Sequence, residues 1–368
     1  KTLTATGIIN ISAYPKAAKV YINGQLKGVT DINLTLPPGK YSIEIKKDGY
    51  TSWSKDVVLK GELVEVIDVL LFPTNPSLSP LTNLGISKAV PVKDSNKIIL
   101  FSDNDDKEKD GIYVFEPNRP LPIFVPLKLL VLKKFLPEAV DFKTVKVYFS
   151  PDLKEALFNF PLKGFGQPEI AYLFSLDEEN QPLFDVTNSK KTLLAAWEEE
   201  NQKKIIKILE TFPKEIKKVA SDSFQIVDFS PDEQKILYQV KYPVTLPLAI
   251  TPPLIASNQT PEERFLKTNT LYVYDKKEDK NFKIEKLSSE KRLNWSWYYD
   301  SKHLIVNEDG ENKKISVVDY DGLNRQPIYS GPLEGSFFMI TTDGKLIILA
   351  NLNPEANKLP DLYLVGIK

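Results

Sequence analysis

The chain has 368 residues, of which 42% are hydrophobic and 26% charged, a composition typical of a folded globular protein with two or three domains. Its 48 basic and 49 acidic side chains nearly cancel, and no run of Lys and Arg is long enough to bind a phosphate backbone, so the sequence indicates no nucleic-acid partner. The absence of cysteine excludes disulfides, thiolate metal sites and cysteine nucleophiles, and no stretch has the roughly 18 uncharged apolar residues of a membrane-spanning helix.

Residues 1–73 are predicted to form a small β-sandwich. Short runs of alternating apolar and polar residues are separated by turn signals at Asn23-Gly24, Pro37-Pro38-Gly39, Asp48-Gly49 and Lys60-Gly61. Antiparallel strands at this spacing are typical of a sandwich domain.

The same stretch resembles the PEGA domain family. Pro15-Lys16-Ala17-Ala18 stands where the family has Pro-Glu-Gly-Ala, and its two central residues depart from those letters. The resemblance implies an extracytoplasmic module of a prokaryotic envelope or surface protein, with no catalytic role. Contact with a membrane is expected only through an anchor preceding Lys1. The motif positions of the resemblance are Pro15, Ala18, Gly24, Gly39, Gly49 and Tyr50.

Residues 74–80 follow as a run rich in Pro and Ser, and they are predicted to be a short, fairly stiff linker. The second domain is expected to extend over residues 81–368. Its texture is again that of short strands, but here the strands recur in a longer unit.

The repeated unit is centred on an aspartate. Phe-Ser-Pro-Asp occurs twice, ending at Asp152 and Asp232, and each Asp is followed four to six positions later by an apolar triplet. Asp94, Asp300 and Asp343 precede apolar triplets at the same offset. Period-two alternation upstream and an aromatic or β-branched run downstream each predict a further strand. A unit of strand, Asp turn, strand, loop and strand is typical of a propeller blade.

The repeat resembles the WD40-like propellers of the TolB and tricorn type, although only Asp343-Gly344 keeps the Gly that usually ends the motif. After Asp343 there is room for two strands, so the outer strand of the last blade is expected from Leu81–Ile86. This closure would leave only short edges. The fold class predicted is all-β: a small PEGA β-sandwich followed by a five-bladed β-propeller, six blades being the alternative, with a helical insertion.

The five aspartates are interpreted as structural residues of blade turns. Pro151 and Pro231 preset φ in the turn, and Ser and Asp side chains can bond nearby backbone N–H groups. The alternative is a catalytic signature that the chain uses twice.

Other candidates for chemistry are weak. His303 is the only histidine, and no Gly-x-Ser-x-Gly elbow accompanies it, so neither a Ser-His-Asp triad nor an imidazole metal site is predicted. Asp103–Gly111 has the carboxylate density of a calcium loop without the EF-hand spacing, and a solvated acidic turn is the preferred interpretation. The prediction is therefore of no catalytic residue, metal or cofactor.

An aromatic row, Leu293–Asp300, could be a sugar-stacking platform, but packing between neighbouring blades is the preferred interpretation. Three insertions are predicted at about 121–140, 189–220 and 242–264, and the second is expected to be helical with a break at Pro213. All three are expected on the rim opposite the Ser-Pro-Asp turns, where long loops would form a partner surface or else pack on the PEGA domain.

The function predicted is that of a non-enzymatic binding or scaffolding module of the prokaryotic cell envelope or surface, with a protein or a cell-surface polymer as partner. A glycan-processing enzyme, or a carbohydrate-binding accessory propeller, is the alternative. Two carboxylates facing each other across a cleft at roughly 5 to 9.5 Å would favour the enzyme, whereas an apolar patch would favour a protein partner.

Overall fold

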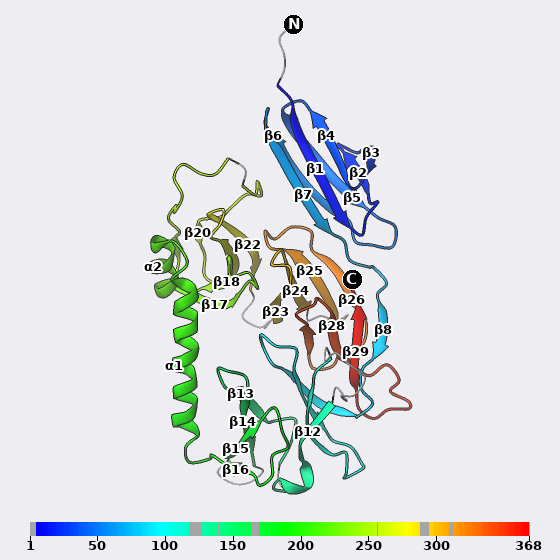
Figure 1. The fold of residues 1–368 in the computed structure, drawn as a ribbon, viewed down its shortest axis with the longest axis vertical. Helices are drawn as coiled ribbons and strands as arrows, with labels where there is room; N and C mark the ends of the chain where they lie inside the picture. The colour runs from blue at the N-terminus through cyan, green and yellow to red at the C-terminus, as the bar shows by residue number, and fades with distance from the viewer. Residues whose placement is uncertain are drawn as a thin grey trace. The chain divides into compact units, whose positions relative to one another are not determined.

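The structure is a computed structural model that describes residues 5–117, 127–138, 140–162, 169–255, 257–287, 294–308 and 313–367 (Figure 1). These residues form two compact units. The first comprises residues up to Ser77, then Phe212–Gly331 and the end of the chain from Gly366, and the second comprises Leu78–Thr211 and Pro332–Val365.

The N-terminal part of the first unit is a β-sandwich of two sheets, with strand orders β4-β1-β7 and β3-β2-β5-β6 (Figure 1). Alternate residues of β1, including Ile9 and Ile11, are fully buried, as period-two strands with one core face require. Its strands are β1 Gly7–Tyr14, β2 Lys19–Ile22, β3 Gln25–Val29, β4 Ile32–Leu36, β5 Gly39–Lys46, β6 Trp53–Leu59 and β7 Val64–Leu70.

Strand β1 lies in the middle of its sheet, antiparallel to β4 and parallel to β7. Strands β6 and β7 each end their own sheet, so each has one edge that no strand of the same sheet pairs with. Unpaired edges expose a row of backbone donors and acceptors, and a protein must cover them or use them. In the described chain side-chain amides cover the edge of β6, whereas no strand pairs with the outer edge of β7.

The first unit also holds two four-stranded antiparallel sheets, a two-stranded hairpin and a helix. Sheet β17-β18-β21-β22 packs against sheet β23-β24-β25-β26 through a cluster that includes Leu237, Val273 and Trp297. The elements are α2 Lys214–Ser223, β17 Phe224–Phe229, β18 Lys235–Val240, β19 Val244–Thr245, β20 Phe265–Leu266, β21 Thr270–Asp275, β22 Lys280–Lys286, β23 Asn294–Trp297, β24 His303–Glu308, β25 Lys314–Asp319 and β26 Gln326–Ser330.

The second unit holds three more four-stranded sheets, ordered β12-β11-β10-β9, β13-β14-β15-β16 and β27-β28-β29-β8. Phe101, Phe142 and Phe158 lie in the core shared by the first two of these sheets. The elements are β8 Ser77–Pro80, β9 Ile86–Pro91, β10 Ile98–Ser102, β11 Gly111–Phe115, β12 Leu127–Leu132, the short 3-10 helix η1 Lys133–Phe135, β13 Lys146–Phe149, β14 Glu155–Pro161, β15 Glu169–Ser175, β16 Phe184–Asp185, α1 Lys190–Leu209, β27 Phe338–Ile340, β28 Leu346–Ala350 and β29 Asp361–Gly366.

The predicted all-β class and the repeated unit are confirmed. The described residues beyond the sandwich form five four-stranded antiparallel sheets, and every predicted apolar triplet lies in the second strand of one of them. These triplets are buried because each second strand lies between two other strands of its sheet and both faces of the sheet are covered at that strand. The triplets are Ile98-Ile99-Leu100, Ala156-Leu157-Phe158, Ile236-Leu237-Tyr238, Leu304-Ile305-Val306 and Ile347-Ile348-Leu349.

The outer strand of the last sheet differs from the prediction. It is β8, Ser77–Pro80, rather than Leu81–Ile86, and it lies within the run that the sequence indicated as linker. The Leu81 N–H then donates to the carbonyl of Leu362 in β29 (2.8 Å). Proline is tolerated here because an outer strand has a free edge that needs no N–H donor.

The placement of the predicted insertions also needs correction. Within the predicted insertion 121–140, residues 127–132 form strand β12 of a sheet. Residues 121–126 and 139 lie outside the described residues. The helical segment does break at Pro213, between α1 and α2. It does not stay on one rim, however: Lys190 at the start of α1 contacts Glu169 and Asn159, away from the Ser-Pro-Asp turn, whereas Lys204 reaches the carbonyl of Pro151 inside that turn.

Helix α1 therefore lies along its sheet from one end to the other, with Trp197 buried against Leu157 and Ala171. In the first unit, Phe212 lies beside Phe229, next to the other Ser-Pro-Asp turn, with 6.4 Å between ring centroids. Helix α1 thus covers one side of the sheet β13-β14-β15-β16 and is not a loop at one end of it.

Candidate functional site: the junction of the sandwich and the 242–264 insertion

A buried ion pair joins the sandwich to the sheet β23-β24-β25-β26. The Lys55 Nζ of β6 lies 2.8 Å from the Asp321 Oδ2 in the turn between β25 and β26, and the two side chains are only 15% and 3% exposed. The insertion completes the cluster, because Asn258 Oδ1 accepts from Lys55 (2.7 Å) and the Thr260 hydroxyl donates to Asp321 (2.6 Å). Burial alone would raise the pKa of Asp321, but Lys55 and these donors outweigh it and hold the pKa below its usual range.

A second cluster surrounds His303, which is 6% exposed. Its Nδ1 lies 2.7 Å from Asp300 Oδ2 and its Nε2 lies 3.4 Å from Asp319 Oδ1, so a carboxylate faces each ring nitrogen. Trp53 Nε1 of the sandwich donates to the other oxygen of Asp319 (3.0 Å), and Phe72 meets the imidazole edge-on at 5.5 Å between centroids. An imidazolium is the form that can donate to both carboxylates.

The pKa directions agree with that assignment. Burial alone lowers the pKa of His303, but the hydrogen bond and charge of Asp300 and the charge of Asp319 outweigh burial and raise it. For Asp300, burial is outweighed by His303, and its pKa is lowered. At Asp319 burial, together with the negative charge of Asp321, outweighs the charge of His303 and raises the pKa. The cluster thus connects the sandwich to β23–β25 through a protonated side chain.

Side-chain amides cover the free edge of β6. The Val58 N–H donates to Gln259 Oε1 (2.7 Å), and Gln259 Nε2 donates back to the Val58 carbonyl (3.3 Å), so one primary amide takes the place of a neighbouring strand. Two residues after Asp321 bind the chain farther along: the Ser54 N–H donates to Asn324 Oδ1 (2.9 Å), and Gln326 Nε2 donates to the Ser52 carbonyl just before β6 (3.1 Å). This edge is therefore closed by the rest of the first unit.

The 242–264 insertion is itself held in place. Both the Ala249 and Ile250 N–H groups donate to Asp279 Oδ2 (2.8 and 2.9 Å), and Arg264 Nη1 donates to the Pro247 carbonyl (2.7 Å). Arg264 also pairs with Asp279. Anchored at these points, the insertion presents Leu254, Ile255 and Ser257–Gln259 to the sandwich.

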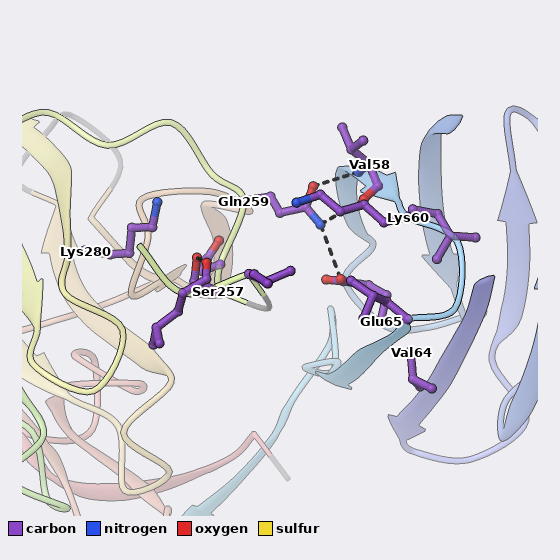
Figure 2. Close-up of a pocket in the computed structure, with 12 residues that line it drawn as sticks. Val58, Lys60, Val64, Glu65, Ser257, Gln259 and Lys280 are labelled. Carbon is purple, nitrogen blue, oxygen red and sulfur yellow. Dashed lines mark hydrogen bonds between the residues drawn. The ribbon is translucent and has the colours of Figure 1, made fainter. Parts of the chain in front are cut away.

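A pocket of about 210 Å³ lies where β6 and β7 meet Leu254, Ile255 and residues 257–259 of the insertion (Figure 2). Val58, Lys60 and Glu65 line it from the sandwich, and Ile255 and Gln259 line it from the insertion. In Figure 2 the carboxylate of Glu65 points toward the Gln259 amide, which donates to it (3.2 Å). Burial raises the pKa of Glu65, and the Gln259 amide and the charge of Lys55 compensate only in part.

The aspartates predicted from the repeat lie in the turns between the first and second strands of the five sheets. Asp152 and Asp232 each accept from the preceding Ser hydroxyl (2.7 and 2.6 Å) and from the backbone N–H two positions on (3.2 and 3.0 Å). The same Ser oxygens also accept the N–H that opens the second strand. These Ser and Asp hydrogen bonds therefore shape the two turns.

The other three copies vary this turn. Asp343 accepts from the Thr341 hydroxyl (2.5 Å), which replaces the Ser, and Asp300 accepts from two backbone N–H groups while binding His303. In the first sheet Asp94 itself adopts a left-handed φ of 59°, and Ser95 bonds the Lys97 N–H. Four of the five turns thus place the left-handed residue directly after the Asp, and the first turn places it on Asp94 itself.

The motif residues of the sandwich are placed at its turns and core. Ala18 is fully buried, and the Asn23-Gly24 pair turns the chain between β2 and β3 with left-handed φ values of 49° and 77°. Gly49 is left-handed at 80° after β5, and the adjoining Tyr50 forms a bridge with Pro73. Gly39 opens β5, and Pro15 follows β1. None of these residues lines the pocket.

The acidic segment at 103–110 and the aromatic row at 294–300 are both engaged in contacts within the fold. The acidic residues of 103–110 are met by lysines, with Lys133 contacting Asp103 and Lys358 lying 2.8 Å from Asp105. Trp295 and Trp297 pack with Leu237 and Val273 between two sheets. Among the described residues no group of three or more His, Asp and Glu side chains is arranged to hold a metal ion, and no helix is both long and apolar enough to cross a membrane.

The junction residues Trp53, Lys55, Asn258 and Gln259 were not identified from the sequence. Each belongs to a strand or loop that looks ordinary by itself, and the partners of Lys55 lie some 200 residues or more along the chain. The one available signal was the insertion of a long segment at 242–264, which indicated a surface but not what it packs against.

Comparison with known proteins identifies the sandwich. Residues 6–71 match the model of the PEGA domain. No curated protein matches the chain. Among solved structures, a protein described as TolB from Agrobacterium tumefaciens is similar at 13% identity and a TM-score of 0.24, with 85% of this chain and 78% of that chain covered.

Two enzymes of solved structure are similar to this chain at comparably low identity and TM-score. An oligogalacturonate lyase in complex with manganese has 11% identity and a TM-score of 0.24, over 89% of this chain and 74% of the lyase. An acylaminoacyl peptidase from Pyrococcus horikoshii has 11% identity and a TM-score of 0.21, and the alignment spans 73% of this chain but only 35% of the peptidase. Similarity this low does not allow the function of these proteins to be transferred to the chain. The part of the chain that matches a known family is residues 6–71, the PEGA domain.

Proposed function

We propose that this chain is a non-enzymatic, extracytoplasmic binding or scaffolding protein of a prokaryotic cell envelope, with a protein or a surface polymer as its partner. The PEGA domain match supports the location, because the resemblance of residues 6–71 implies an envelope module. In the same proposal the five four-stranded sheets are the blades of one β-propeller. The contribution of β8, from before the first sheet, to the last sheet supports such a ring.

The observation that carries the proposal is the composite surface at the junction. The insertion is anchored by Asp279 and Arg264, its Asn258 joins the buried Lys55–Asp321 pair, and its next residue closes the β6 edge. Rigid presentation of a loop beside a second domain lowers the entropy lost on binding, which is the usual reason for building a recognition surface this way. We therefore propose this junction, rather than a rim of loops, as the partner surface.

The test is site-specific photo-crosslinking of the full chain in its native host. A photoreactive residue replaces Ile255, which is 71% exposed beside the pocket, and a matched control replaces Leu26, which is 58% exposed on β3. A discrete envelope component that crosslinks from position 255 and not from position 26 is the expected result. Equal capture from both positions, or turnover of envelope glycans by the purified chain, would count against the proposal.

A further inference from the structure

Strand β7 keeps an open edge beside the pocket. It ends the sheet β4-β1-β7, and no strand of the described chain pairs with its outer side. Val64 and Val66 on this strand are 53% and 67% exposed, a high exposure for β-branched apolar residues in a strand. The neighbouring edge of β6 is closed by the Gln259 amide, so coverage stops at the boundary between the two strands.

The register shows which backbone groups are free. The Ile8 N–H donates to the Leu63 carbonyl (2.9 Å), and the Leu71 N–H donates to the Tyr14 carbonyl (2.8 Å), so the odd-numbered residues around β7 bond to β1. Backbone groups alternate along a strand, and the N–H and C=O groups of Val64 and Val66 therefore point to the outer side. These four groups form a short ladder, ready for one more strand.

The side-chain alternation defines what that strand would present. By alternation Val64 and Val66 lie on the outer face and Glu65 between them lies on the inner side, and Val64 and Glu65 both line the pocket. Among the described residues Glu65 accepts from the Gln259 amide and has no Lys or Arg nitrogen within ion-pair distance, although Lys60 and Lys280 line the same pocket and the charge of Lys55 acts on Glu65 from farther away. A half-buried carboxylate in that position is suited to a cation brought by a ligand.

We propose that β7 is a strand-addition site, at which an extended segment of a partner protein pairs with Val64–Val66, places apolar side chains beside the two valines and directs a basic side chain to Glu65. The inference rests on the proposed binding function and names its partner as a protein rather than a polymer. Main-chain hydrogen bonds would supply the affinity, and the pocket would supply the preference for a basic residue.

The extent of the site follows from its surroundings. On the outer face, the ion pair between Asp68 and Lys302 (2.8 Å) occupies β7 two residues beyond Val66. At the other end the chain turns at Glu62, which has a left-handed φ of 62°. The added strand is therefore short, about three to five residues, with one inward-facing position.

The test uses a blocked, dye-labelled pentapeptide of sequence threonine-valine-lysine-valine-threonine and its counterpart with glutamate in place of lysine, titrated against the full chain by fluorescence anisotropy. Val66→Pro removes an outward N–H without removing any bond to β1, and Val66→Ala is its matched control because it keeps that N–H. Glu65→Gln keeps the shape of the side chain and removes its charge.

The expected results are binding of the lysine peptide in the micromolar to millimolar range, a loss of about tenfold or more with Val66→Pro and a loss of about threefold with Val66→Ala. Glu65→Gln should abolish the preference for lysine over glutamate. Circular dichroism and the amide exchange of β1 report whether each variant keeps its fold.

The inference is overturned if the lysine peptide does not bind at about 1 mM, if Val66→Pro binds it as well as the unmodified chain does, or if both peptides bind alike. Its failure is distinct from that of the proposed function. A partner that still crosslinks from position 255 in the Val66→Pro chain would leave a binding protein whose partner uses another surface, whereas peptide binding without any crosslinked partner would contradict the proposed function and not the strand site.

Discussion

At the scale of single residues, the most informative side chain is His303. It lies between Asp300 and Asp319, with both ring nitrogens facing carboxylates. An isolated buried imidazole would lose its proton, but here the two acids retain it. No catalytic role was predicted for this histidine, and the structure places it in a junction where Phe72 packs against it and Trp53 donates to Asp319.

This placement predicts how stability depends on pH. Because the pKa of His303 is raised in the folded state, its contribution is complete below the unfolded pKa of about 6.5 and is lost as the pH rises through the folded pKa. The lowered pKa of Asp300 acts in the opposite range, where stability present above the unfolded pKa is lost as the pH falls through the folded value. Lys302 and Asp319 are the other charges that act on the imidazole.

His303→Gln cannot carry the charge and leaves two carboxylates facing each other. The variant is expected to lose about 3 kcal/mol of unfolding free energy at about pH 6 and less at about pH 9. Urea denaturation followed by tryptophan fluorescence at both pH values measures this. A variant whose stability differs from the parent by the same amount at both pH values would contradict the assignment of a protonated His303.

At the scale of elements, the turns show why a variable motif can give a constant shape. In four of the five turns the residue after the aspartate is left-handed: Leu153 (59°), Glu233 (55°), Ser301 (59°) and Gly344 (84°). Non-glycine residues pay about 1 kcal/mol or more for that conformation. The Ser and Asp hydrogen bonds stabilise the turn enough for the sequence to dispense with glycine.

Glu233→Gly should relieve this strain. The gain is partly offset by the greater freedom of glycine in the unfolded chain, so we expect a change between zero and about 1 kcal/mol in the stabilising direction. Gly344→Ala is expected to cost about 1 kcal/mol. Gln234→Gly, one position farther on and outside the left-handed region, is the control and should destabilise by about 0.5–1 kcal/mol. Thermal unfolding that ranks Glu233→Gly below Gln234→Gly would refute the strain argument.

At the scale of the whole molecule, the first unit is made of segments far apart in the sequence. The sandwich and residues from Phe212 to Gly331 belong to one compact unit, although Leu78–Thr211 lies between them in the chain. The Lys55–Asp321 pair joins residues 266 positions apart, and Asn258 and Thr260 complete its hydrogen bonds. A buried pair of this kind specifies which surfaces meet, because each charge is costly without the other.

Lys55→Met should therefore affect both sides of the junction. Leaving Asp321 buried without its cation is expected to cost about 3 kcal/mol and to speed amide hydrogen exchange in both β6 and β25. Exchange in β14, in the other unit, should not change. Lys40→Met is the matched control, since Lys40 pairs with Asp56 at the surface with 69% and 55% exposure, and it should change nothing measurable. An effect confined to β6 would show that the sandwich opens independently of β25.

The sequence by itself determined the strands and turns. Period-two alternation, the turn glycines at positions 24 and 49, and the Ser-Pro-Asp frame act over a few residues, so their physics can be recognised without a fold. The PEGA resemblance was likewise carried by local turn and core positions, and the domain match agrees with it.

Tertiary structure alone decided the site. Nothing local distinguishes Lys55, Asn258 or Gln259 from other polar surface residues, and their roles arise only when distant segments bury them together. The same holds for the open edge of β7, since whether a strand is an edge depends on which strands lie beside it. Local hydrogen bonding and hydrophobic alternation are readable along the chain, whereas desolvation, charge pairing and edge exposure are properties of the assembled fold.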